Sequence, residues 1–341
     1  GIFPFRPDFP SRNDAPIPQQ VKRDTYGLDY TYNPVSKLID VDTNVYQTKT
    51  RILRDSDYIK NPGFDFNAQV KTTGAKIQNT STIDTNVGTH KLIAGVEHYK
   101  KESEMERDFI KKGSDEAKNT SVYLEDQWKN GKLTLTPGVR YDRYESPEFV
   151  AGGKTYDNVV GALAASYEIA PMTQVFASYT QLFNGPDLSQ AIFNSDGDKT
   201  YVNKDLKAEE GSNAEIGIVK TLRDLTVAGD ALQLSGKYFE TDIENFIEFV
   251  RSGGTRVGLD CTTGQLAGAC QGAVNKDEDY KIKGVELAAD YKMDNFSMGL
   301  SYAHARSKGD KTGYSIPTVT GGSADSGDKY MVNLAYVPTD T

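Results

Sequence analysis

The sequence predicts an all-β protein, a transmembrane antiparallel β-barrel, from three observations. The first is strict alternation of apolar and polar residues, as in 133–142, where Leu135 and Val139 share one face and Thr136 and Arg140 share the other. The second is that short and long connections alternate between these stretches, and the third is that tyrosines gather near their ends. Successive strand residues point to opposite sides of a sheet. In a membrane barrel the apolar side meets lipid and the polar side lines the lumen.

Thirteen stretches show this alternation, and each is predicted to be one strand. In the first, Tyr26 and Leu28 alternate with small and polar residues, and near the end of the chain Leu287 and Leu300 alternate with Glu286 and Ser301 in the same way. The predicted strands, in order, span residues 21–33, 37–51, 65–83, 88–102, 116–129, 132–145, 156–169, 173–183, 207–221, 230–250, 279–291, 295–308 and 328–337.

The connections between the predicted strands fall into two classes. Short ones carry turn residues such as Asn, Gly and Pro, and they lie at 33–36, 130–131, 170–172 and 293–294. Long ones are predicted to be extracellular loops near 1–20, 52–64, 103–115, 146–155, 184–206, 251–278 and 309–327. Tight periplasmic turns and long extracellular loops are typical of outer-membrane barrels. The tyrosines expected to form an aromatic girdle are Tyr32, Tyr99, Tyr141, Tyr144, Tyr291 and Tyr302.

Composition and motifs exclude several function classes. The net charge of −9 without a basic stripe argues against nucleic-acid binding. No nucleophile motif, metal-ligand spacing or phosphate loop occurs, so we expect no catalytic site, no certain metal site and no permanent cofactor. A soluble adhesive β-protein would have no reason to place its long loops at one end.

The two cysteines, Cys261 and Cys270, lie close together in a loop rich in Gly and Thr. A pair of cysteines in such a loop indicates a disulfide formed in an oxidising compartment, and the alternative is two free thiols.

Two segments carry a family resemblance. Residues 174–188 and 203–217 resemble the TonB-dependent outer-membrane receptors, and most of all their haem/haemoglobin-receptor branch, which has a FRAP box and an NPNL box flanking one extracellular loop. Phe183 and Pro186 match the first box, and Asn203 and Leu206 match the second. The departures are Asn184, Gly185, Lys204 and Asp205.

The resemblance implies a larger architecture than this chain contains. Thirteen is an odd number, whereas bacterial single-chain barrels close with an even one. We therefore expect a fragment of a larger, 22-stranded barrel, with residues 1–341 forming part of the wall and the family's plug domain absent. The implied partners are outer-membrane lipid, the TonB complex acting through that plug, and haem or a host haemoprotein.

The resemblance also implies where a ligand binds. We expect ligand contacts at Phe183, Pro186, Tyr201, Asn203 and Leu206. Receptors of this branch commonly place a histidine between the boxes, but residues 187–202 contain none, and the three histidines lie elsewhere, at His90, His98 and His304. A tyrosine phenolate can ligate haem iron, so Tyr201 is a possible haem ligand. The alternative is that Tyr201 only packs within the loop.

The sequence therefore predicts an outer-membrane receptor that captures haem or a haemoprotein and imports haem with TonB-transmitted energy. A ferric-siderophore receptor of the same architecture is the alternative. A barrel enzyme such as an outer-membrane lipase is a third reading, which would require a Ser-His pair on the barrel wall.

Overall fold

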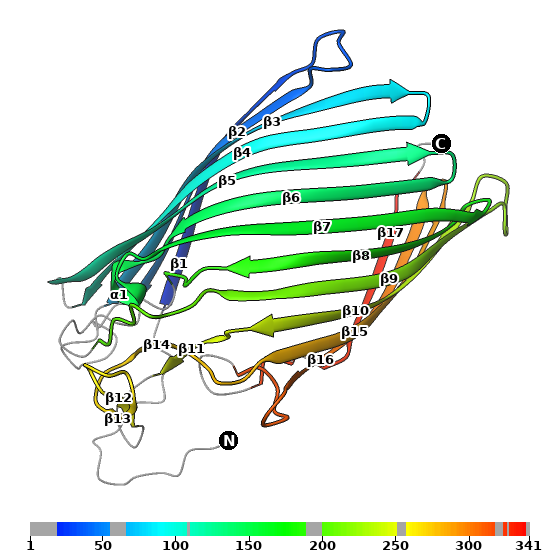
Figure 1. Ribbon diagram of the computed structural model, residues 1–341. Coiled ribbons are helices and arrows are strands. Elements are labelled where there is room, and N and C mark those ends of the chain that lie inside the picture. The colour runs from blue at the N-terminus through cyan, green and yellow to red at the C-terminus, as the bar shows by residue number, and fades with distance from the viewer. Residues whose placement is uncertain are drawn as a thin grey trace.

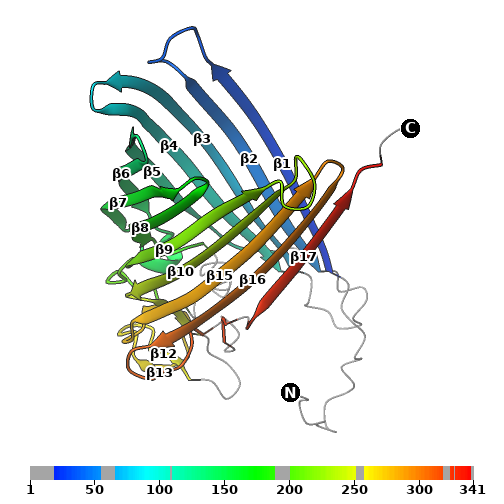
Figure 2. The same cartoon turned by 90° about the vertical axis from the view of Figure 1, so that its right-hand side faces the viewer.

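A computed structural model describes residues 19–54, 66–107, 110–188, 200–250, 257–317, 323–325 and 327–338. Figures 1 and 2 show one long antiparallel sheet that curves into a trough. It has 13 strands in the described part of the chain, and they pair in chain order, with β15 following β10 because β11–β14 lie outside the sheet. The all-β antiparallel barrel architecture expected from the alternation is confirmed.

The strands agree closely with the predicted stretches. The first eight are β1 (Gln19–Tyr32), β2 (Val41–Arg54), β3 (Phe66–Thr85), β4 (Gly88–Arg107), β5 (Ile110–Asn130), β6 (Leu133–Glu145), β7 (Thr155–Ala170) and β8 (Thr173–Asn184). The sheet continues with β9 (Glu209–Arg223), β10 (Ala231–Glu244), β15 (Tyr280–Met293), β16 (Phe296–Gly309) and β17 (Lys329–Tyr336). Outside it lie α1 (Glu148–Ala151), β11 (Ile247–Val250), β12 (Gly258–Leu259), β13 (Leu266–Gly268) and β14 (Gly272–Asn275).

The two faces of the sheet follow the predicted phase. Arg140 on β6 reaches over β5 to bind Glu97 on β4 at 3.2 Å, and on the same side it binds Ser121 Oγ at 2.6 Å and Asp142 at 3.0 Å. Arg140 and Glu97 are two strands apart, and they come this close because they lie on the concave face of the curved sheet. Large apolar side chains of the opposite phase are exposed on the convex face, among them Val139, Leu163, Leu287, Leu300 and Leu334.

The short turns lie together at the end we assign to the periplasm. Two-residue connections join β3 to β4, β5 to β6, β7 to β8 and β15 to β16. Gly131, Met172 and Asp294 have positive φ values of 56°, 55° and 34°, the left-handed conformation that tight hairpin turns require. No helix in the described ranges is long and apolar enough to cross a membrane.

The predicted long loop at 103–115 is wrong. β4 and β5 continue as a paired ladder to Arg107 and Ile110, with a register shift at Met105/Glu106. The two strands have 20 and 21 residues, about twice the 9–11 that cross a bilayer. Their outer parts extend beyond this length. One face there is buried and carries the polar Ser103 and Asp115 beside Met105, so the alternation of apolar and polar residues that marks a strand is weak.

Two further expectations need correction. The stretch 230–250 is not one strand, because β10 ends at Glu244, Asn245 takes a left-handed φ of 54°, and β11 pairs with β14 instead. Tyr99 and Tyr144 do not belong to a lipid-facing girdle, because both lie on the concave face, and the Tyr144 ring is buried. The predicted loops at 1–20, 52–64, 184–206, 251–278 and 309–327 fall wholly or partly outside the described residues.

The face assignment can be tested on a single strand. On β6, Val139 is exposed on the convex face, whereas Thr136 lies on the concave face. We expect Val139→Arg to destabilise the full-length receptor folded in lipid vesicles by ~2–4 kcal/mol, the cost of arginine at the bilayer midplane. Thr136→Arg is the control, and it should cost much less. Equal losses in reversible unfolding would contradict the assignment.

Candidate functional site

Three loop segments meet at the extracellular end of the trough. They are 146–154 with α1, 185–188 continued by 200–208, and 245–250 continued by 257–279 with β11–β14. Figure 1 shows α1 and β11–β14 at this end, opposite the short turns. A small apolar cluster joins all three segments, and its buried members are Val150, Ala151, Leu206, Ile247 and Ala273. The two family-like boxes lie within this assembly.

The Phe183/Pro186 box attaches the loop after β8 to the wall. Pro186 is buried, and its carbonyl accepts a hydrogen bond from the Tyr144 hydroxyl at 2.6 Å. Gly185 passes so close to the Tyr144 ring that an added Cβ would lie 2.2 Å from it, so only glycine fits here. Leu188 is buried in a cluster with Tyr144, and Phe183 packs against its edge. These residues fix the path of the chain as it leaves the strand.

Asn203 ties two loops together through its backbone and its side chain. Its N–H donates to the Val150 carbonyl at 3.1 Å, and its Nδ2 donates to the Ala273 carbonyl at 3.1 Å. Its Oδ1 accepts from the Asp205 N–H at 3.2 Å, which closes a local turn. Both polar atoms of the side chain are therefore engaged within the protein.

Leu206 is the centre of the apolar cluster. Its side chain is 0% exposed and packs with the cluster members from the other two loops. Its carbonyl accepts hydrogen bonds from Lys154 Nζ at 2.9 Å and from the Tyr156 hydroxyl at 2.7 Å. Tyr156 belongs to β7, so this contact joins the loop assembly to the wall.

The sequence analysis missed two residues that complete this assembly. Asn275 accepts from the Lys207 N–H at 2.8 Å, and its Nδ2 donates to the carbonyls of Lys207 and Asn245 at 3.0 and 2.7 Å. Asp115 on β5 accepts from the N–H groups of Glu148 and Phe149 at 2.8 and 2.9 Å, which caps α1. Asp is a preferred capping residue, but it normally lies next to its helix in sequence, so local capping rules give no signal for a partner 33 residues away.

Tyr201 lies against the disulfide-closed segment. Cys261 and Cys270 are bonded, with their Cα atoms 5.3 Å apart, so the predicted disulfide is confirmed. The Tyr201 N–H donates to the Gln271 carbonyl at 2.9 Å, and the Tyr201 ring covers Gly264, where an added Cβ would lie 2.5 Å from a ring carbon. The Tyr201 side chain is half-buried, and no hydrogen bond of its hydroxyl is present among the described residues.

The concave wall below the loops carries aromatic and charged side chains. Lys101 on β4 binds Asp187 at 3.0 Å, and its ammonium lies 5.7 Å from the centre of the Tyr99 ring. Further down the wall, Arg140 lies 5.8 Å from the Tyr123 ring while it binds Glu97 and Asp142. The interior near the mouth is therefore polar and rich in both signs of charge.

The histidines lie away from the loop assembly, on the convex phase. His98 contacts Thr120 Oγ1 at 2.8 Å, His304 contacts Asp328 at 2.5 Å, and His90 contacts Asp126 at 2.8 Å near a short turn. Within the described ranges no group of three or more His, Cys, Asp or Glu side chains is arranged to hold a metal ion.

Fold and site together define the wall and loops of an outer-membrane receptor. The chain belongs to the TonB dependent receptor-like beta-barrel family, whose model matches residues 3–340. It is therefore an outer-membrane barrel.

The chain is also similar to individual family members. It is 24% identical over 266 residues to the hemin receptor of Yersinia enterocolitica, covering 73% of this chain and 38% of that protein. It is 22% identical over 349 residues to the heme/hemopexin utilization protein C of Haemophilus influenzae, covering 92% and 46%. The chain thus spans less than half the length of these curated relatives.

Solved structures share the fold. The FrpB iron transporter of Neisseria meningitidis superposes with a TM-score of 0.70 at 19% identity, covering 94% of this chain and 49% of that one. The Serratia marcescens hemophore receptor HasR, solved with its hemophore HasA and heme, gives 0.67 at 20% identity, covering 84% and 48%.

The packing of Leu206 can be tested by truncation. We expect Leu206→Ala to destabilise the loop assembly by ~2–5 kcal/mol, the range for truncating a buried leucine. Limited proteolysis of the full-length receptor should then cut faster within 146–154, 200–208 and 245–279, while the barrel stays folded. Leu266→Ala is the matched control, because Leu266 is 68% exposed. Unchanged cleavage in Leu206→Ala would show that the cluster does not hold the loops.

A buried carboxylate links two neighbouring extracellular loops and makes their contact pH-dependent. Glu278 accepts from the Thr312 hydroxyl at 2.5 Å and the Thr312 N–H at 2.8 Å, and it lies 3.3 Å from Lys276 Nζ. These donors, the Thr312 hydroxyl foremost, lower the pKa of Glu278 to about 2 from an ordinary value of 4.5. A lowered pKa stabilises the folded loops above the unfolded value and loses that effect as pH falls through the folded one.

We therefore expect the loop contact to weaken between about pH 4.5 and pH 2. Hydrogen exchange at the Thr312 amide, corrected for intrinsic rates, should show protection falling across this window. Glu278→Gln should remove the pH dependence, whereas Asp205→Asn should keep it, because Asp205 is an exposed carboxylate on a different loop segment. The same pH profile in Glu278→Gln and the native protein would refute the assignment.

Proposed function

We propose that the whole receptor captures haem or a haem-carrying protein at its extracellular loops and imports haem, using energy that the TonB complex delivers through a plug domain. The observation that carries the proposal is the loop assembly, which holds Tyr201 and the disulfide-closed segment at the barrel mouth. The names of the curated relatives, which are hemin and heme/hemopexin proteins, support the same ligand class. No chemistry on the ligand is proposed.

In this proposal the two boxes position the ligand-binding loop, and residues between them contact the ligand. Pro186 and Leu206 are buried, and the Asn203 amide is engaged by backbone groups, so these side chains offer no free polar group. Tyr201 differs, because its half-buried ring is fixed against Gly264 while its hydroxyl has no partner among the described residues. A tyrosine oxygen held in this way is suited to ligate ferric haem.

In this proposal haem passes along the concave wall of the barrel. Lys101, Arg140 and Lys237 supply cations that anionic groups such as haem propionates can meet in turn. Each is already paired with a carboxylate: Lys101 with Asp187, Arg140 with Glu97 and the buried Asp142, and Lys237 with Glu215. A propionate that moves along the wall would exchange with these carboxylates for one cation after another, and the exchange is easiest at the more accessible Lys101–Asp187 pair.

A ferric-siderophore receptor is the second candidate. Its support is that the ferric-catecholate receptor Fiu and the alcaligin receptor FauA share the fold with a TM-score of 0.64 each, although at 14% and 16% identity. Tyr201 does not separate the two ligands, because its hydroxyl can ligate haem iron and can equally donate a hydrogen bond to an oxygen of a ferric siderophore. Direct binding of each ligand to the full-length receptor separates them.

Replacing Tyr201 tests the haem proposal. Hemin titrated into the full-length receptor should give a Soret band, and Tyr201→Phe should shift this band and weaken binding at least tenfold, roughly the loss seen when a metal-site group is removed. Tyr314→Phe is the control, because Tyr314 is another extracellular tyrosine and is 76% exposed. Trp128 does not contact this site, because its indole binds the Val87 carbonyl at the opposite end of the barrel.

Each outcome of this titration supports one interpretation. An unchanged spectrum in Tyr201→Phe would show that Tyr201 is not the ligand, while a Soret band in the native receptor would still support haem binding. No Soret band, together with saturable uptake of a ferric-catecholate absorbance, would overturn the haem proposal in favour of the siderophore candidate.

A further inference from the structure

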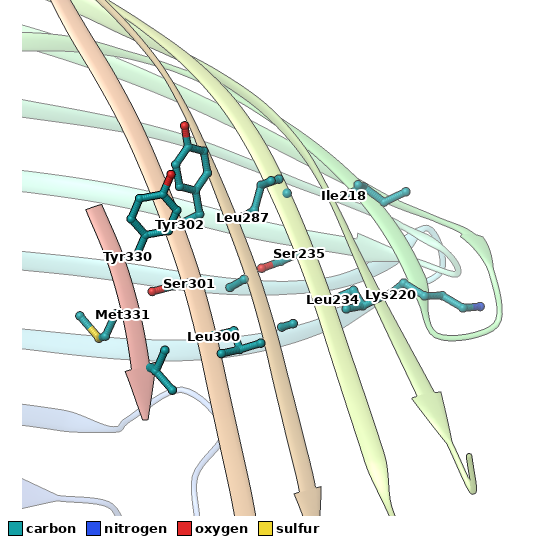
Figure 3. Close-up of a pocket in the computed structure, with 14 residues that line it drawn as sticks. Ile218, Lys220, Leu234, Ser235, Leu287, Leu300, Ser301, Tyr302, Tyr330 and Met331 are labelled. Atoms are coloured by element: carbon teal, nitrogen blue, oxygen red, sulfur yellow. The ribbon is translucent and has the colours of Figure 1, made fainter. Parts of the chain in front are cut away.

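The convex wall carries an apolar hollow of about 670 Å³ over β9, β10 and β15–β17. Figure 3 shows the side chains that line it. Cross-strand pairing arranges the convex-facing ones in two rows. The row nearer the short turns is Lys220, Leu234, Ala289, Leu300 and Val332, and the other row is Ile218, Gly236, Leu287, Tyr302 and Tyr330.

The hollow exists because two positions in these rows lack a long side chain. Gly236 lies between Ile218 and Leu287 in its row, and Ala289 lies between Leu234 and Leu300 in the other. The strands are adjacent, so the two small residues form one shallow floor bordered by larger ones. In a membrane this hollow faces hydrocarbon, and leaving it empty would forfeit dispersion contacts with every atom of its lining.

One end of the hollow carries a positive charge. Lys220 is the only charged residue among the described residues that line it. It lies near the end of β9, and its Nζ donates to the carbonyl of Pro171 in the short β7–β8 turn at 3.3 Å. A lysine ammonium has three donors, so two remain for another group. This ammonium therefore lies at the periplasmic boundary of the lipid-facing band, where phospholipid phosphates are found.

We propose that the hollow is a binding site for one phospholipid of the periplasmic leaflet. One acyl chain lies over Gly236 and Ala289, between Leu287 and Leu300, and the phosphate binds the Lys220 ammonium. Two features make this a site instead of ordinary lipid contact: a recess of defined shape, and a cation at the one end where the anionic headgroup of a periplasmic-leaflet lipid lies. The site is independent of the ligand that the receptor transports.

Native mass spectrometry of the delipidated full-length receptor, incubated with phosphatidylglycerol, tests the proposal. The native protein should retain one phosphatidylglycerol at detergent concentrations that strip other lipid. Ala289→Phe fills the floor and should abolish this retention. Lys220→Gln should weaken it about fivefold, the equivalent of ~1 kcal/mol for one lysine at a membrane surface.

Matched controls keep the test specific. Ala94→Phe adds the same ring at an exposed convex-face position on β4, beside Leu124, and should retain the lipid. Lys292→Gln removes a lysine at the periplasmic end of β15 on the concave phase, and should also retain it. If Ala289→Phe fails to fold, as judged by heat-modifiable migration in gels, Gly236→Val fills the same recess from the neighbouring strand.

Three results would overturn the proposal. They are equal retention in the native protein and a folded hollow-filling variant, an equal loss in Ala94→Phe, and retention of lipopolysaccharide in place of phosphatidylglycerol when both are offered.

Discussion

Backbone hydrogen bonding in a solvent without water is the constraint on which this structure depends. Each unpaired N–H or C=O in hydrocarbon costs several kcal/mol, so a spanning sheet must pair every strand along its length. Pairing of neighbours in chain order meets this requirement with the shortest connections, and β1 to β10 followed by β15 to β17 do so. The segments that leave the sheet, α1 and β11–β14, all lie beyond the wall at one end, where water can satisfy their backbone (Figure 1).

In the loops, side chains satisfy the backbone groups that strand pairing satisfies in the wall. Where the strands end, chain segments are packed together and their backbone groups are shielded again, and leaving such a group without a partner costs about 1–3 kcal/mol. Asn203, Asn275 and Asp115 supply the missing donors and acceptors, and Leu206 supplies the apolar contact between the segments. The result is a fixed platform made from residues far apart in sequence. Segments held on it can vary without disturbing the wall.

The fold was predictable because lipid imposes its own pattern on the sequence. Alternation such as that around Val139 and Arg140 exists because one face meets hydrocarbon and the other water, and it located every strand of the large sheet. Prediction failed where this contrast ends. The outer parts of β4 and β5 bury polar residues such as Ser103 and Asp115, so they resembled a loop. Tyr99 and Tyr144 resembled interface residues because they lie near strand ends, although their phase places them on the concave face. The contacts that build the site join residues tens of positions apart, as Asn203 joins Ala273, and no local rule contains them.

The two boxes were found from the sequence, but their structural roles were not. A box residue that contacts ligand needs an accessible group, whereas the Leu206 side chain is fully buried and the Pro186 carbonyl is occupied by Tyr144. Their placement explains why a receptor would need both boxes whatever it transports, since each fixes one end of the intervening loop to the wall. The ligand-specific chemistry is then left to that loop. In the proposed function Tyr201, which is fixed at the second end of this loop against the disulfide-closed segment, would take the place of the missing histidine while the platform stays the same.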